Sequence, residues 1–224
     1  MVSYNININN KSGSPTAFCV FTHPPKVDST DSPTIYTNVF QKSHIADSDD
    51  GQANFTIDRK VYAICLTSSD DLKAGTNVQT SEKKEVIIGD YTTPASIVQA
   101  TYHDDSGDLD DPVPSTENNS PPGGFVIKTA GFKYPTEDNF CIGIGTRTGG
   151  KNIPLAVFPA KPNTTYNIFP VTKFYVTPAG SYEPGDIIDV KAIGQSHLVN
   201  FTGSGKTTMN IDFANDGQFY PASD

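Results

Sequence analysis

The sequence of 224 residues predicts an all-β fold, a two-sheet antiparallel β-sandwich of jelly-roll or Greek-key-like topology with long loops. Three observations predict it. Apolar and polar residues alternate in several short segments, and turns containing glycine separate these segments. No window long enough for a helix repeats its apolar residues every 3.6 positions. The 18 glycines and 17 prolines also suit a chain of many short strands and turns.

The clearest alternation lies near the two ends of the sequence, in segments 4–9 and 208–213. Every second residue is apolar in both, as expected of strands with one face on a core and the other in water. The residues on the apolar faces are Tyr4, Ile6, Ile8, Met209, Ile211 and Phe213. Further strands are expected at 18–21, 35–40, 54–57, 61–66, 86–88, 97–102, 125–129, 140–144, 155–158, 166–169, 174–177, 187–190 and 197–201.

The length and the even spacing of these segments favour one domain over residues 1–224, because single β-sandwiches often reach this size. One segment, at about 103–124, interrupts the spacing. It is rich in aspartate and proline and nearly free of apolar residues. Such a segment buries too little surface to offset the entropy of ordering it, so we expect a long exposed loop there.

Composition restricts the partners that the protein is expected to bind. The net charge of −9 repels phosphate backbones and anionic lipids, so neither a nucleic acid nor a membrane is expected as a partner. The first ten residues lack the pattern of a secretory signal, which favours a cytoplasmic location. Cys19, Cys65 and Cys141 each stand among apolar neighbours, and we interpret them as buried, reduced thiols.

The aspartates of segment 103–124 are candidate metal ligands. Carboxylates on an exposed loop are the ligands that Ca²⁺ prefers, although their order is not that of an EF-hand. A solvated charged loop is the favoured interpretation, and no cofactor is expected. The candidate Ca²⁺ ligands are Asp104, Asp105, Asp108, Asp110 and Asp111.

The sequence contains no local pattern typical of a catalytic site. Segment 203–208 resembles the end of a phosphate-binding loop, but Asn200 stands where the first glycine is needed and a strand follows in place of a helix. We therefore expect a plain hairpin loop there. The four histidines are scattered, and no serine or cysteine stands in a known nucleophile motif. Hydrolysis by residues from distant strands stays open as an alternative.

Two other features suggest packing or binding roles. Gly143 and Gly145 alternate with apolar residues in one expected strand, which indicates a bulge or the close approach of another backbone. Tyr182 and Tyr220 lie near expected loops, and aromatic rings in such places can stack on sugars. The sequence has no tryptophan, which weakens the case for carbohydrate binding.

Several ordered blocks of the chain resemble the rhizosphere-induced (RhiA-type) protein family. The front block is YNININNKSG followed by FCVF, and the later blocks are IGIG, FYVT, GDIID and NDG. They match mainly residues 4–22 and 140–220, while the stretch from about 67 to 124 has no counterpart that we recognise. The resemblance implies an intracellular β-rich protein without assigned catalytic residues.

These features lead to one main functional expectation. We expect a non-enzymatic cytoplasmic protein that self-assembles or binds a partner through its sheet surfaces, as an abundant structural or storage-like component. A homo-oligomer or higher assembly is therefore the expected state. The alternative is a lectin-like or Ca²⁺-dependent carbohydrate-binding module that uses the acidic loop and exposed tyrosines.

Overall fold

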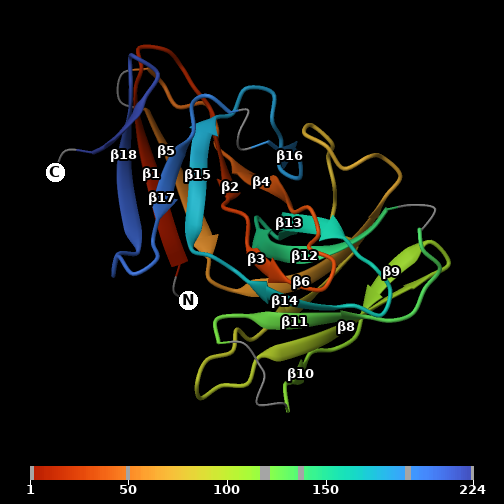
Figure 1. Cartoon of the computed structure of the whole chain (residues 1–224). Helices are drawn as coiled ribbons and strands as arrows, with labels where there is room; N and C mark the ends of the chain where they lie inside the picture. Colours follow the sequence, from red (N-terminus) through yellow and green to blue (C-terminus); the bar gives the residue numbers. More distant parts are fainter. Residues whose placement is uncertain (1–2, 49–50, 117–121, 136–138, 190–192, 223–224) are drawn as a thin grey trace.

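The computed structural model describes residues 3–48, 51–116, 122–135, 139–189 and 193–222. These residues form β-strands and no helix (Figure 1), which confirms the predicted all-β class. It follows that none of the described segments is a helix with the length and apolarity to cross a membrane. The strands lie in three sheets of four, six and nine strands.

The nine-stranded sheet runs through the middle of the molecule. Its strands, in spatial order, are β17 (His197–Asn200), β15 (Lys173–Pro178), β2 (Phe18–Thr22), β4 (Tyr36–Lys42), β13 (Lys151–Pro159), β12 (Asn139–Thr148), β6 (Val61–Ser68) and β7 (Glu82–Val86), with β16 (Ile187–Ile188) paired to β4. Its pairings are antiparallel.

The other two sheets are smaller. The four-stranded sheet consists, in spatial order, of β19 (Phe219–Pro221), β18 (Thr208–Ala214), β1 (Ser3–Lys11) and β5 (Gly51–Asp58). The six-stranded sheet consists of β10 (Val113–Pro114), β8 (Ser96–His103), β11 (Phe125–Thr129), β14 (Thr165–Phe169) and β3 (Lys26–Asp28), with β9 (Ser106–Leu109) paired to β8. Each contains one parallel pair, β1 with β18 and β8 with β11.

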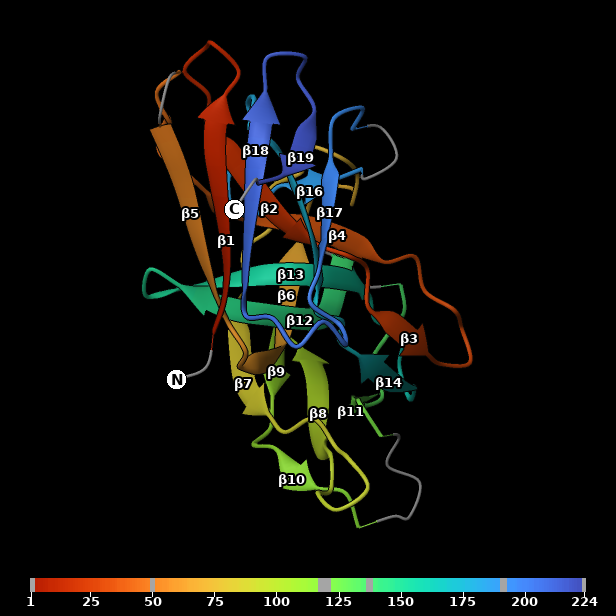
Figure 2. The same ribbon diagram turned by 90° about the vertical axis from the view of Figure 1, so that its left-hand side faces the viewer.

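The three sheets make a sandwich in which one layer is divided. Alternate residues of β2 face opposite sides, because Phe18 and Val20 belong to the main core while Cys19 and Phe21 belong to a separate cluster. The main core also contains the inward residues of both smaller sheets. The nine-stranded sheet is therefore one layer, and the four- and six-stranded sheets cover different parts of it, the former in the upper and the latter in the lower half of Figure 2.

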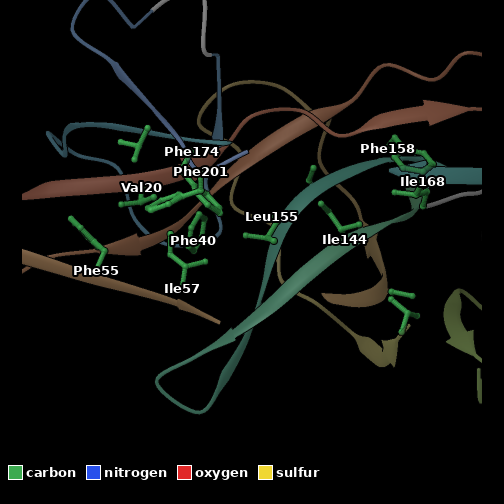
Figure 3. Packing of buried hydrophobic residues seen from close by; sticks show 14 of the residues in the cluster. Val20, Phe40, Phe55, Ile57, Ile144, Leu155, Phe158, Ile168, Phe174 and Phe201 are labelled. Carbon is green, nitrogen blue, oxygen red and sulfur yellow. The ribbon is translucent and has the colours of Figure 1, made fainter. Parts of the chain in front are cut away.

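Aromatic contacts join the nine-stranded sheet to each smaller sheet. The ring centroids of Phe18 and Phe213 lie 5.2 Å apart at the four-stranded sheet, and those of Phe158 and Tyr166 lie 5.2 Å apart at the six-stranded sheet. Such pairs stabilise a core beyond the burial of their area. Figure 3 shows two groups of this core, with Phe158 and Ile168 in one and Phe40, Phe174 and Phe201 in the other.

The alternation in 4–9 and 208–213 is confirmed, and it sets which face of each strand is buried. Ile6 and Ile8 of β1 and Ile211 and Phe213 of β18 are buried, and Met209 packs against the same core. The two strands are aligned residue for residue, with Ile8 opposite Ile211. Their apolar faces therefore cover the nine-stranded sheet together.

Several strands depart from the expected positions. The segment expected at 86–88 forms β7 earlier, at Glu82–Val86, and the segment expected at 187–190 forms only β16, with residue 190 outside the described part. The loop at 203–207 is not a hairpin, because it connects β17 of one layer to β18 of the other. The sequence analysis also missed β3, β9, β10 and β19.

Segment 103–124 is only partly the loop that was predicted. Residues 106–109 form β9, which makes a hairpin with β8, and residues 113–114 form β10, while residues 117–121 lie outside the described part. Gly107 and Leu109 of β9 are buried, whereas Ser106 and Asp108 are exposed. The strand forms because these two residues cover the ring of Phe140 and the core around it.

Asn10 is the polar residue on the buried face of β1. Its side chain is fully buried, and its Nδ2 lies 2.8, 3.0 and 3.1 Å from the carbonyl oxygens of Ser14, Ala46 and Asp47. The hydroxyl of Ser12 donates to its Oδ1 at 2.7 Å. This one amide therefore ties the end of β1 to the segment that follows β4.

We expect Asn10→Ala to lower the free energy of unfolding by about 3 kcal/mol, because buried carbonyl groups lose their donor. Asn7→Ala is the matched control on the same strand, since Asn7 makes an exposed hydrogen bond of 2.9 Å to Asn210. Its cost should stay below about 1 kcal/mol. Urea denaturation of both variants measures the difference, and equal costs would contradict the role assigned to Asn10.

Candidate interaction edge and polar face

The solvent side of the four-stranded sheet is covered by amides and hydroxyls. Asn7 Nδ2 donates to Asn210 Oδ1 at 2.9 Å, and Thr56 Oγ1 donates to Asn5 Oδ1 at 3.0 Å. These contacts cross from β1 to both neighbouring strands. We call this surface the polar face; its residues are Asn5, Asn7, Asn9, Gln52, Asn54, Thr56, Thr208, Asn210 and Asp212.

An ion pair lies at one end of the polar face. Lys11 Nζ is 2.6 Å from Asp212 Oδ2, and Asn9 Nδ2 donates to Asp212 Oδ1 at 2.8 Å. Burial raises the pKa of Asp212, but the hydrogen bonds from Lys11 and Asn9 outweigh it and hold the pKa below its ordinary value. Asp212 is therefore the fixed negative charge of a surface that otherwise consists of neutral groups.

Strand β5 is an edge of the four-stranded sheet, and its backbone direction follows from β1. The N–H of Asn5 donates to the carbonyl of Thr207. The backbone groups of Asn5 and of every second residue after it therefore bond to β18. The backbone groups of the residues between them bond to β5. Gln52, Asn54 and Thr56 of β5 stand opposite the residues that bond to β18. Their backbone N–H and C=O groups therefore point away from the sheet.

This edge lacks the features that usually protect a sheet from pairing with another strand. Strand β5 has eight residues, none of them proline or lysine, and its pairing with β1 shows no bulge (Figure 2). The other edge strands differ. Strands β10, β3 and β19 have two or three residues, β17 has four, and β7 has the sequence EKKEV. Among these edge strands, β5 is therefore the longest, and it has neither lysine nor proline.

A shallow groove of about 480 Å³ runs beside β5. Gln41 Nε2 donates to the carbonyl of Thr56 at 2.7 Å and lies 3.3 Å from Thr148 Oγ1, so one outward carbonyl of β5 already has a partner. Arg147 and the turn of the β12–β13 hairpin form the opposite wall. The residues that line the groove are polar, apart from Gly149, which suits a backbone with polar side chains.

The structure does not bring the five candidate Ca²⁺ ligands into one site. Asp104 and Asp105 occupy the β8–β9 turn with φ of 48° and 59°, and their carboxylates contact His103 at 2.8 Å and the hydroxyl of Tyr102 at 3.1 Å. Within the described ranges, no three acidic, histidine or cysteine side chains are grouped as a metal site requires.

The remaining aspartates have separate partners. Asp111 lies 2.9 Å from Lys84 Nζ, on the neighbouring β7, and Asp108 accepts a hydrogen bond of 2.8 Å from the backbone N–H of Leu109. A hydrogen bond with Glu82 and this N–H hold the pKa of Asp108 below its ordinary value. Asp110 is exposed. The acidic segment is thus a hairpin surface with local contacts.

The other residues singled out from the sequence are also separate. Tyr182 is half-buried against a small cluster, while Tyr220 is exposed and its hydroxyl donates to Asp216 at 2.7 Å. The three cysteines are buried and free, as predicted. Sequence reasoning missed Gln41 and Arg147 as neighbours of β5, because only the pairing of strands brings them together.

The comparisons with known proteins give one match. The model of the RhiA family matches residues 2–221. The match includes the stretch 67–124, for which the sequence analysis recognised no counterpart, so it confirms and extends the resemblance. No curated protein and no solved structure matches the chain.

Proposed function

Because the chain belongs to the RhiA family and this membership assigns no site, we propose a function from the geometry. The protein is a non-enzymatic cytoplasmic protein that acts by self-association. The observation that supports this proposal is the open edge of β5. An edge strand of this length is a template for another strand, although Gln41 already bonds to the outward carbonyl of Thr56. The proposed partner is a second copy, in keeping with an abundant structural or storage-like component.

The geometry of β5 suits pairing with itself. Two β5 strands run antiparallel around a two-fold axis at Asn54, which is the self-complementary arrangement of a symmetric dimer. Asn54 of one copy then faces Asn54 of the other, and Gln52 faces Thr56. The four-stranded sheet continues across the interface, and the polar faces of both copies form one surface.

Sedimentation velocity over a range of concentrations tests this proposal. We expect the mass to rise from that of one 24.1 kDa chain to that of two. Asn54→Lys should keep the protein monomeric, because the two added cations face each other at the axis. Asn200→Lys is the matched control, since it adds the same charge on the edge strand β17. A wild-type protein that stays at 24.1 kDa up to about 1 mM overturns the proposal, as does a dimeric Asn54→Lys variant.

Carbohydrate binding is the second candidate, and the polar face is the observation that favours it. Amides and hydroxyls on one flat surface can bond to sugar hydroxyls, and Tyr220 lies exposed on the adjacent β19. A glycan array run with and without a calcium chelator separates this candidate from self-association. Binding that Asn7→Ala weakens supports it, and an array without any bound glycan removes it.

A further inference from the structure

An apolar cavity lies where the four-stranded sheet meets the nine-stranded sheet. Its volume is about 260 Å³, and its lining comes from these two sheets and from connecting segments. Tyr4 and Ile57 belong to the four-stranded sheet, Leu155 and Phe174 belong to the nine-stranded sheet, and Val171 lies in the segment after β14 of the six-stranded sheet. The cavity therefore lies between two sheets and is closed on one side by the segment that connects β14 to β15.

The size of this cavity exceeds that of an ordinary packing defect. Protein interiors contain few voids larger than a water molecule, and an apolar cavity of about 150 Å³ is already able to bind benzene. Figure 3 shows Ile57, Phe174 and Leu155, together with Ile144, whose side chains surround this region. By proportion with benzene, the space suits an apolar group of about six to ten carbon atoms.

The rim of the cavity carries a cation with free donors. The guanidinium carbon of Arg59 lies 4.2 Å from the centroid of the Tyr4 ring, so the side chain lies over the aromatic wall. In the described part of the chain, Arg59 has no ion pair, whereas the neighbouring Lys60 pairs with Glu85 at 2.8 Å. Its guanidinium N–H groups are thus available to a ligand.

Asp58 also lines the cavity and sets the turn that presents Arg59. Its carboxylate accepts a hydrogen bond of 3.0 Å from the backbone N–H of Lys60. This contact closes the turn between β5 and β6 and holds the carboxylate toward the backbone. Arg59 is therefore the group at this rim that is suited to hold an anionic head.

We propose that this cavity binds a small amphipathic carboxylate, with its apolar part inside and its carboxylate on Arg59. A planar guanidinium pairs with a carboxylate through two parallel hydrogen bonds, and an apolar lining accepts the rest of the molecule. The negative charge of the whole protein makes a dedicated cation necessary for an anion to bind here. This proposal does not depend on self-association, because β5 uses its outer edge and the cavity lies under its inner face.

Calorimetric titration with octanoate and with the neutral 1-octanol tests the proposal. We expect octanoate to bind with a one-to-one stoichiometry and about tenfold more tightly than 1-octanol. Arg59→Gln should remove this preference and leave the binding of 1-octanol unchanged. Arg147→Gln is the matched control, because it removes the other arginine of the sequence, which lies outside the cavity.

A second variant tests the cavity itself. Val171→Trp places a large ring in a half-exposed position of the lining and should abolish the binding of both ligands, and thermal denaturation verifies that the variant is folded. Absence of octanoate binding to the wild-type protein overturns the proposal. So does equal affinity of the wild-type protein and Arg59→Gln for octanoate. The sedimentation of Arg59→Gln should match that of the wild-type protein. The proposal of ligand binding and the proposal of self-association can therefore fail independently.

Discussion

Replacing Gly143 with alanine should lower the free energy of unfolding by about 3 kcal/mol or more. Gly143 lies on β12, where β13 and β6 pair on either side. A Cβ added there would overlap the carbonyl oxygen of Ala156 and lie 2.9 Å from the Cα of Val157. Both atoms belong to the backbone of β13, so a strand in the middle of the nine-stranded sheet would have to move.

Gly194→Ala is the control for this substitution. No heavy atom lies within 4 Å of a Cβ added at Gly194, and its φ lies outside the left-handed region. Its effect should stay within about 0.5 kcal/mol, or be slightly stabilising through the unfolded state. Guanidinium denaturation of the two variants measures the contrast, and a cost below about 1 kcal/mol for Gly143→Ala would show that β13 adapts easily.

The three thiols of the native protein should react with Ellman's reagent about a thousandfold more slowly than an exposed thiol at pH 8. Burial raises the pKa of Cys19, Cys65 and Cys141 from 9.0 to about 12. The fraction of each thiol that is in the reactive thiolate form at pH 8 is therefore lower, and the folded chain also blocks the access of the reagent. Asn215→Cys, in the exposed turn between β18 and β19, provides an internal standard.

The same pKa values predict how stability depends on alkaline pH. Above about pH 9 the unfolded chain releases thiol protons that the folded chain retains up to about pH 12. The raised pKa values therefore contribute stability below pH 9, and this contribution is lost as the pH rises from 9 to 12. In the test with Ellman's reagent, complete reaction of one native thiol within seconds at pH 8 would contradict the assigned burial of the cysteines.

Local alternation was enough to predict strands that have one face in water. In β1 and β18 each buried isoleucine stands between polar residues, so the sequence shows the orientation directly. In β9 the inward residues are Gly107 and Leu109. A glycine adds no apolar signal, although an added Cβ at Gly107 would lie 3.0 Å from Cδ2 of Phe140. The backbone itself covers that ring, and composition cannot reveal such a contact.

The candidate site depended on pairing, which local patterns do not specify. The outward residues Gln52 and Asn54 could be predicted from alternation, but the open edge exists only because β1 pairs with β18 on its other side. Strand β7 is a similar case. Its charged residues hide the alternation of apolar and polar side chains. Charges on an edge strand protect it from pairing with another strand, and they do not mark a buried face. Arg59 and Tyr4 are far apart in the sequence, and the pairing of β1 with β5 brings them together.

The pairing of β1 with β18 has a consequence for synthesis on the ribosome. Asn7 and Asn210, which are hydrogen-bonded, stand 203 positions apart in the sequence. At about 5–20 residues per second, the nascent chain waits roughly 10–40 s before β18 emerges to meet β1. During that delay the edge of β1 that later pairs with β18 has no partner strand. Co-translational chaperones would therefore have more time to bind β1 than any strand made after it.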